Sequence, residues 1–182
     1  DLDKEGKFLN AWGEGIFSSA HGIFIDRNDH VWCADNLDHT VRKFTTSGEL
    51  LMTLGKADQP ADTGFMLGRT PVQYAGGPFN MVTNVAVAED GELFISDGYG
   101  NARVHRFSAG GKLLASWGGP GNGPGQFNLP HGIVVDRSGR VLVADRENSR
   151  IQFFSKDGEY LNSWDWVNRP DDLFLDEQEN LY

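Results

Sequence analysis

The chain has 182 residues, of which 39% are hydrophobic and 23% charged, a composition typical of a globular domain with a buried core. Its net charge of −10, without any cluster of lysine and arginine, argues against nucleic acid as a partner. No apolar run approaches the roughly 18 residues that a membrane span needs, so no membrane partner is expected. The single cysteine, Cys33, excludes an internal disulfide.

Taken in chain order, the sequence is organised by a repeat. Residues 3–13 match the end of a repeat, full copies begin at residues 21, 83 and 131, and residues 170–182 match the start of another. Each full copy contains four short runs of β-forming residues separated by turn signals, including Asn28-Asp29, Asp90-Gly91 and Ser138-Gly139. Four such runs in each repeat predict the blade of a β-propeller.

The predicted fold is all-β, with one propeller domain over residues 1–182 that is incomplete at both ends. The repeats amount to about four blades, and a ring of about six blades is the expected whole. An open arc of blades leaves strand edges unpaired, so edge-to-edge self-association of the chain is also expected.

Two connectors between the copies differ in length. The connector at 56–82 is the longer and is the one candidate for an added lid, whereas 118–130 is shorter and rich in glycine. Near its end, each carries a phenylalanine followed by an asparagine, Phe79-Asn80 in the first and Phe127-Asn128 in the second.

The start of the first strand of each blade and the end of the second should lie at the same end of the ring, because these strands are antiparallel neighbours. The second strands end at a repeated aspartate, for which a structural role is expected, bonding backbone amides in the next turn. The first strand lines the central channel. Four residues should therefore surround one mouth of the channel, namely His21, Thr83, His131 and Asp171.

Histidine occupies this position in alternate copies, as His21 and His131. In a six-fold ring, alternate positions form a three-fold set, and three converging imidazoles with open coordination positions are what a catalytic zinc requires. The third histidine would lie beyond residue 182. The alternative is that both imidazoles only fill the channel mouth as hydrogen-bonded side chains.

Three runs of sequence resemble NHL-repeat propellers and, among these, the peptidyl-α-hydroxyglycine α-amidating lyases. The runs are Ile95–Arg103, Pro130–Gly132 and Ala144–Gln152. The resemblance implies zinc bound by His21 and His131, Tyr99 as the catalytic tyrosine, and Arg146 as an arginine of the same site. It also favours a secreted or periplasmic location and a peptide or small-molecule substrate.

The same resemblance implies a structural calcium in the channel, held partly by the backbone carbonyl of Ile23. Well-studied members carry a disulfide around the tyrosine loop, at positions that match Asn80 and Gly100 here. This chain therefore lacks that covalent link.

Each candidate residue also has a structural interpretation. Tyr99 could pack over the next blade, and Arg146 could pair with Glu147 at the surface. Three histidines without repeat partners are interpreted as surface or packing residues, namely His30, His39 and His105. Trp12, Leu54, Trp117 and Trp164 share one register and are interpreted as packing residues in the core or between blades.

The leading interpretation is a zinc-dependent lyase that cleaves a carbinolamide C–N bond to give a peptide amide and glyoxylate. Zinc would polarise or deprotonate the substrate hydroxyl, Tyr99 would handle the proton, and Arg146 would anchor a carboxylate or neutralise developing charge. One alternative is a non-catalytic scaffold that binds a protein, peptide or glycan. Another is a calcium-dependent hydrolase of the lactonase type, for which only Asp171 provides an acidic ligand at the mouth positions.

Overall fold

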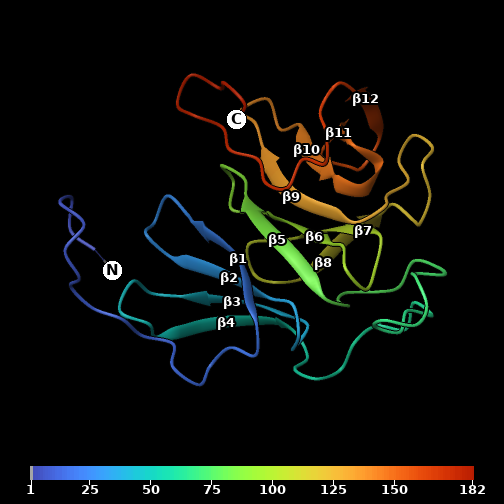
Figure 1. The fold of residues 1–182 in the computed structure, drawn as a ribbon. Helices are drawn as coiled ribbons and strands as arrows, with labels where there is room; N and C mark the ends of the chain where they lie inside the picture. The colour runs from blue at the N-terminus through green and yellow to red at the C-terminus, as the bar shows by residue number, and fades with distance from the viewer. Residues whose placement is uncertain (1) are drawn as a thin grey trace.

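The computed structural model describes residues 2–182 and contains three four-stranded antiparallel sheets arranged side by side in an arc (Figure 1). Each sheet is one repeat, so the predicted all-β propeller fold is confirmed. The first sheet comprises β1 (Ala20–Ile25), β2 (Val31–Asp35), β3 (Thr40–Phe44) and β4 (Leu50–Gly55). The second comprises β5 (Val82–Val87), β6 (Leu93–Asp97), β7 (Arg103–Phe107) and β8 (Leu113–Trp117). The third comprises β9 (Pro130–Val135), β10 (Val141–Asp145), β11 (Arg150–Phe154) and β12 (Tyr160–Trp164).

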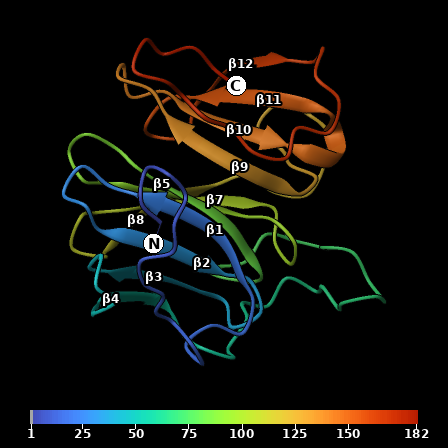
Figure 2. The same ribbon diagram turned by 60° about the vertical axis from the view of Figure 1, so that its left-hand side comes forward.

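In every blade the strands follow one another across the sheet in chain order. The first strands β1, β5 and β9 contact each other from blade to blade, and they form the inner side of the arc (Figures 1 and 2). The second strands β2, β6 and β10 are buried along their whole length. Their nearly continuous apolar runs suit this position, because both faces of each sheet pack against other chain segments.

The core lies between the sheets. One apolar cluster joins the first and second blades around Trp32, Val85 and Leu93. Another joins the second and third blades around Phe94, Ile133 and Phe154. A third lies between the last blade and the segment that follows it, around Phe153 and Leu173.

A large side chain from one blade also covers a turn glycine of the next. A Cβ atom at any of these glycines would lie within 3.0 Å of the covering side chain, and all three glycines have positive φ. The interpretation of this register as packing between blades is therefore confirmed for three of its members. The pairs are Trp12 with Gly48, Leu54 with Gly111, and Trp117 with Gly158.

The segments on either side of the three sheets reproduce the turns of the repeat. In the turn after a first strand, the amide of Asp26 donates to the carbonyl of His30 at 3.0 Å, and Asp176 donates to Asn180 at 3.1 Å. At the other end of the chain, Leu2 forms an antiparallel bridge with Phe8. Both flanking segments thus follow the repeat, as the sequence predicts.

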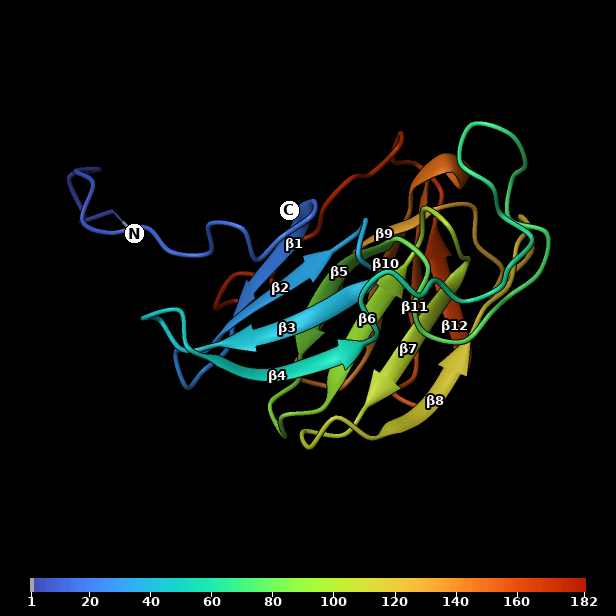
Figure 3. The ribbon, with the colours of Figure 1, turned by 90° about the horizontal axis from the view of Figure 1, so that it is seen from below.

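No helix in the part of the chain that the structure describes is long and apolar enough to cross a membrane. The arc is seen from below in Figure 3, with the connector 56–81 in green and the connector 118–129 in gold on the same side of the molecule.

The thiol of Cys33 should be unreactive in the folded protein. Cys33 packs with Val31 and Phe44, and burial raises the pKa of its thiol to about 11. Because the thiolate is the nucleophile, iodoacetamide at pH 8 should modify Cys33 only after guanidinium unfolds the chain. Mass spectrometry of protein treated with and without denaturant measures this, and rapid labelling of the folded protein would contradict it.

Candidate functional site

Both histidines of the candidate site lie at a β-bulge in an inner strand. In the first blade, Ala20 pairs with Asp35 and Ile23 pairs with Cys33, so two residues of β1 face only one residue of β2. The third blade repeats this irregularity between β9 and β10. A bulge re-aims the side chain that it carries, and here it turns an imidazole toward the channel mouth.

The glycine after each histidine allows neighbouring blades to come close together. A Cβ atom on Gly22 would lie 2.6 Å from the carbonyl oxygen of Thr83, and one on Gly132 would lie 2.7 Å from the Cα atom of Asp172. A larger residue would push the inner strands apart. The His-Gly pair is therefore needed as a unit, one residue to reach the mouth and the other to let the next strand approach.

This close approach fixes the tautomer of each histidine. Nδ1 of His21 lies 2.8 Å from the carbonyl oxygen of Thr83, and Nδ1 of His131 lies 2.6 Å from that of Asp171. A carbonyl can only accept a hydrogen bond, so each Nδ1 carries the proton and each Nε2 keeps its lone pair. Burial lowers the pKa of His131, which favours its neutral, lone-pair form at pH 7.

The two Nε2 atoms converge on the hydroxyl of Tyr99. The distances are 3.2 Å from His21 and 3.1 Å from His131, and the imidazole centroids are 4.8 Å apart. The hydroxyl of Tyr99 has one proton and can donate it to only one of the two Nε2 atoms. The lone pair of the other Nε2 therefore faces the hydroxyl oxygen without a proton between them. A cation between the rings would bind the lone pairs of both Nε2 atoms. This pair of nitrogen ligands therefore fits a metal that favours imidazole, such as zinc.

The fit is incomplete within this chain. Between residues 2 and 182, no three histidine, cysteine, aspartate or glutamate side chains are grouped so that they could hold a metal ion. His21 and His131 thus offer two ligands, whereas protein zinc sites normally use three or four.

The loop that carries Tyr99 is pressed against both neighbouring segments. A Cβ atom on Gly98 would collide with the carbonyl of Pro130, and one on Gly100 would collide with the side chain of Asn80. The two glycines therefore let the loop fit between the connector 56–82 and the next inner strand. This places Tyr99 where its hydroxyl reaches histidines of the blades on either side.

Arg146 lies at the same mouth, on the 3-10 turn Arg146–Asn148 that follows β10. Its Nη1 atom lies 3.5 Å from the hydroxyl of Tyr99, and its Nε atom lies 3.3 Å from Oδ1 of Asp171 and 3.5 Å from Oε1 of Glu147. Asp171 therefore orients His131 through its carbonyl and Arg146 through its carboxylate. The arginine completes a mixed cluster of neutral, cationic and anionic groups.

The structure thus brings together four of the predicted site residues, His21, His131, Tyr99 and Arg146. They line a cavity of about 410 Å³ together with Ile23, which is 67% exposed. Whether these residues bind metals or act in catalysis stays a prediction.

Thr83 lies at the same end of the blades as His21, as expected, but its side chain does not line the mouth. Its side chain is fully buried, and its hydroxyl lies 2.9 Å from the carbonyl oxygen of Pro130. The second blade has Asn84 where its neighbours have glycine. This blade separates the two histidines and carries no imidazole at the mouth.

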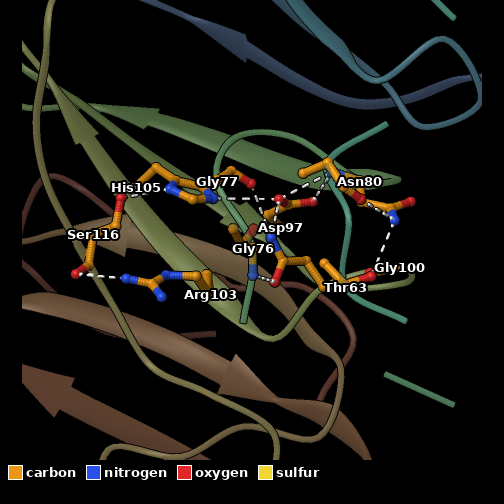
Figure 4. A network of polar contacts seen from close by, with 12 residues as sticks. Thr63, Gly76, Gly77, Asn80, Asp97, Gly100, Arg103, His105 and Ser116 are labelled. Carbon is orange, nitrogen blue, oxygen red and sulfur yellow. Dashed lines mark hydrogen bonds and ion pairs between the residues drawn. The ribbon is translucent and has the colours of Figure 1, made fainter. Parts of the chain in front are cut away.

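A buried polar network supports the Tyr99 loop from below (Figure 4). At its centre is Asp97, which is fully buried and accepts hydrogen bonds from the amide of Asn80 at 3.0 Å and from the side chain of Asn101 at 2.8 Å. Nε2 of His105 lies 3.3 Å from the same carboxylate, and Nδ1 lies 2.7 Å from the hydroxyl of Ser116. His105 is thus a packing residue with no exposed surface.

The same network attaches the long connector to the loop. The hydroxyl of Thr63 donates to the carbonyl of Gly100 at 2.6 Å, and the side chain of Asn80 donates to Thr63 at 3.2 Å and to the carbonyl of Ala61 at 2.9 Å. The amide of Gly100 in turn donates to the carbonyl of Asn80 at 3.1 Å. Hydrogen bonds therefore join the two positions at which the resemblance implies a disulfide in other proteins.

Sequence reasoning missed Thr63, Asn80, Asn101 and His105 as supports of the site. The available signal was the repeated Phe-Asn pair. In each pair the backbone N–H of the asparagine donates to the aspartate at the end of the second strand, at 3.0 Å for Asn80 and 2.8 Å for Asn128. The aspartates are structural, as expected, but their amide partners include the incoming connector as well as the next turn.

Replacing Asn80 should loosen the Tyr99 loop. Asn80→Ala removes two buried hydrogen bonds and should lower the free energy of unfolding by about 1–3 kcal/mol. Amide exchange at 98–102 should become faster, as measured by hydrogen–deuterium exchange. Asn122→Ala, which changes an exposed side chain outside the network, is the matched control. Equal exchange in both variants would contradict the supporting role.

Comparison with known proteins agrees with this architecture. A family model for the NHL repeat matches residues 127–154. The chain is 37% identical to NHL repeat-containing protein 3 of Mus musculus, over 90% of this chain and 47% of that protein. It is 34% identical to a probable peptidyl-alpha-hydroxyglycine alpha-amidating lyase of Caenorhabditis elegans, over 85% of this chain and 42% of that protein.

Among solved structures, a streptogramin B lyase matches with a TM-score of 0.64 and 18% identity, over 91% of this chain and 47% of that one, which supports the fold alone. The chain spans less than half the length of these relatives. From its repeats, its three blades and its relatives, the chain is a β-propeller with an NHL repeat at residues 127–154, similar in sequence to both the amidating lyases and NHL repeat-containing protein 3.

Proposed function

We propose that the complete protein is a zinc-dependent lyase that converts a peptidyl-α-hydroxyglycine into a peptide amide and glyoxylate. The observation that carries this proposal is the convergence of two imidazole lone pairs on the Tyr99 hydroxyl, 3.2 and 3.1 Å away. Similarity to proteins named as amidating lyases supports it.

In this proposal His21 and His131 hold the metal. Zinc, when bound, supplies a Lewis acid that makes the substrate hydroxyl more acidic. Both histidines would bind it through Nε2, because Nδ1 of each donates its proton to a backbone carbonyl, that of Thr83 for His21 and that of Asp171 for His131. The calcium ion implied at the carbonyl of Ile23 stays a prediction.

Tyr99 is assigned the proton transfer. The substrate hydroxyl loses its proton, its C–O bond becomes the carbonyl of glyoxylate, and the C–N bond breaks. The departing amide nitrogen gains one proton, so no net proton is consumed. Tyr99 can donate its phenolic proton to that nitrogen and take the hydroxyl proton in return.

Arg146 is assigned the substrate carboxylate. A guanidinium binds a carboxylate through two parallel hydrogen bonds. Arg146 already lies 3.3 Å from a carboxylate oxygen of Asp171, so its side chain is held at the mouth in a position where it can meet an anion. Substrate binding would require Arg146 to share or exchange this partner.

The second candidate function is a non-catalytic scaffold that binds a protein, peptide or glycan. The observation that favours it is the similarity to NHL repeat-containing protein 3, at 37% identity. Release of glyoxylate from an N-acyl-α-hydroxyglycine separates the two, because a scaffold leaves this compound intact.

Removing the Tyr99 hydroxyl should stop most of the turnover. In the complete protein, Tyr99→Phe should lower kcat by about 10²–10⁴-fold with the fold intact, because the proton relay is lost. Glyoxylate release measures this, with circular dichroism to check folding. Tyr74→Phe, which removes an exposed hydroxyl bonded to Asp62, should keep full activity. Unchanged turnover in Tyr99→Phe would return Tyr99 to a packing role.

Zinc should bind residues 1–182 weakly and through the two histidines. His131→Ala should abolish the binding seen by titration calorimetry, and His39→Ala should preserve it. Protons compete with the metal for the imidazoles, so binding should fade as the pH falls below about 6.5. Burial lowers the pKa of His131, so this imidazole should stay neutral, and able to bind the metal, to a lower pH than an ordinary histidine. Equal binding by the wild type and His131→Ala would contradict the proposed site.

A further inference from the structure

A second cavity adjoins the first. It has a volume of about 450 Å³ and is lined by residues of the connectors 56–82 and 118–130. Its volume is within the range of about 300–1,000 Å³ that is typical of small-molecule sites. Tyr99 is the residue that lines both cavities.

The lining of the second cavity is uncharged throughout. Phe65 and Val72 of the long connector face Pro120 and Gly121 of the short one, and Phe127, only 1% exposed, lies beneath them. The cavity around His21 differs, because Arg146, Asp171 and Asp172 line it. The two cavities therefore divide the mouth into a charged part and an apolar part.

Amide groups surround the apolar part. Four asparagines contribute to the lining of the second cavity, and two of them are fixed by the fold. Asn101 donates to Asp97 at 2.8 Å, and Asn148 donates to Asp145 at 2.8 Å and to the carbonyl of Gly121 at 2.9 Å. Because Asn101 and Asn148 already donate both amide hydrogens within the fold, Asn122 and Asn128 are the asparagines left to bond the backbone of a peptide, whose side chain the apolar walls would bury. The four are Asn101, Asn122, Asn128 and Asn148.

We propose that this second cavity binds the residue that precedes the hydroxyglycine, and that it selects peptides in which this residue is large and apolar. The proposal rests on the proposed lyase function, because the charged cavity that Tyr99 also lines must hold the hydroxyglycine. The long connector, which has no equal among the other repeats, then acts as a specificity element that supplies Phe65 and Val72.

The test compares three substrates in the complete protein. They are N-acetyl-α-hydroxyglycine and the acetylated dipeptides with phenylalanine or aspartate before α-hydroxyglycine. The phenylalanine substrate should exceed the aspartate one by about tenfold or more in kcat/KM, in keeping with the usual discrimination by an apolar pocket. Phe65→Ala and Val72→Asp should each remove most of this preference and leave turnover of N-acetyl-α-hydroxyglycine unchanged.

Leu67→Ala is the matched control. Leu67 lies on the same connector, is 70% exposed and does not line the cavity, so the preference should survive its loss. Turnover of all three substrates at equal kcat/KM by the wild type would overturn the subsite and leave the lyase function standing. An equal preference for the phenylalanine substrate in Phe65→Ala and Leu67→Ala would also overturn the subsite and leave the lyase function standing.

A binding measurement keeps the two proposals separate if no substrate is turned over. Acetyl-phenylalanine amide, the product of the proposed reaction, should bind the wild type more tightly than Phe65→Ala by about tenfold in titration calorimetry. Tighter binding without turnover would overturn the lyase function and support the cavity as a peptide site. Equal affinities of the wild type and Phe65→Ala would overturn the cavity proposal itself.

Discussion

The burial of one carboxylate in each blade is the constraint on which the architecture depends. Asp35, Asp97 and Asp145 end the second strands with no exposed surface, and a buried carboxylate is very costly unless donors surround it. Around Asp145 these donors are the amide of Asn128 and the side chains of Asn148, Arg150 and Gln152. Burial still raises the pKa of Asp145, so each donor matters.

Satisfying these carboxylates also shapes the mouth. The amide donors come from the incoming connectors, so each connector is held against the end of the second strand. The same carboxylate also bonds the loop that follows the strand, and in the second blade that loop carries Tyr99. The position of the phenol is thus set by a fully buried carboxylate.

Much of the site could be predicted from the sequence because it follows the repeat. The register of the histidines and the antiparallel pairing of the first two strands were enough to place His21, His131, Tyr99 and Arg146 at one mouth. Among the supports of Tyr99, Asn80 could have been found from the repeated Phe-Asn pair, but Thr63 could not, because it lies in the part of the long connector that has no counterpart in the other copies. The burial of Thr83 was missed because the spacing of residues does not reveal a bulge or the direction in which it turns a side chain.

The blade between the two histidines constrains how a protein of this kind can change its number of repeats. The Nε2 atoms of His21 and His131 reach one hydroxyl because only a single blade, which carries that hydroxyl on Tyr99, separates them. Duplication of that blade would move the histidines out of reach of Tyr99. Its deletion would remove Thr83, whose carbonyl holds His21, and Tyr99 itself. Gain or loss of a repeat within this three-blade unit would therefore break up the cluster, so the unit can be inherited only as a whole.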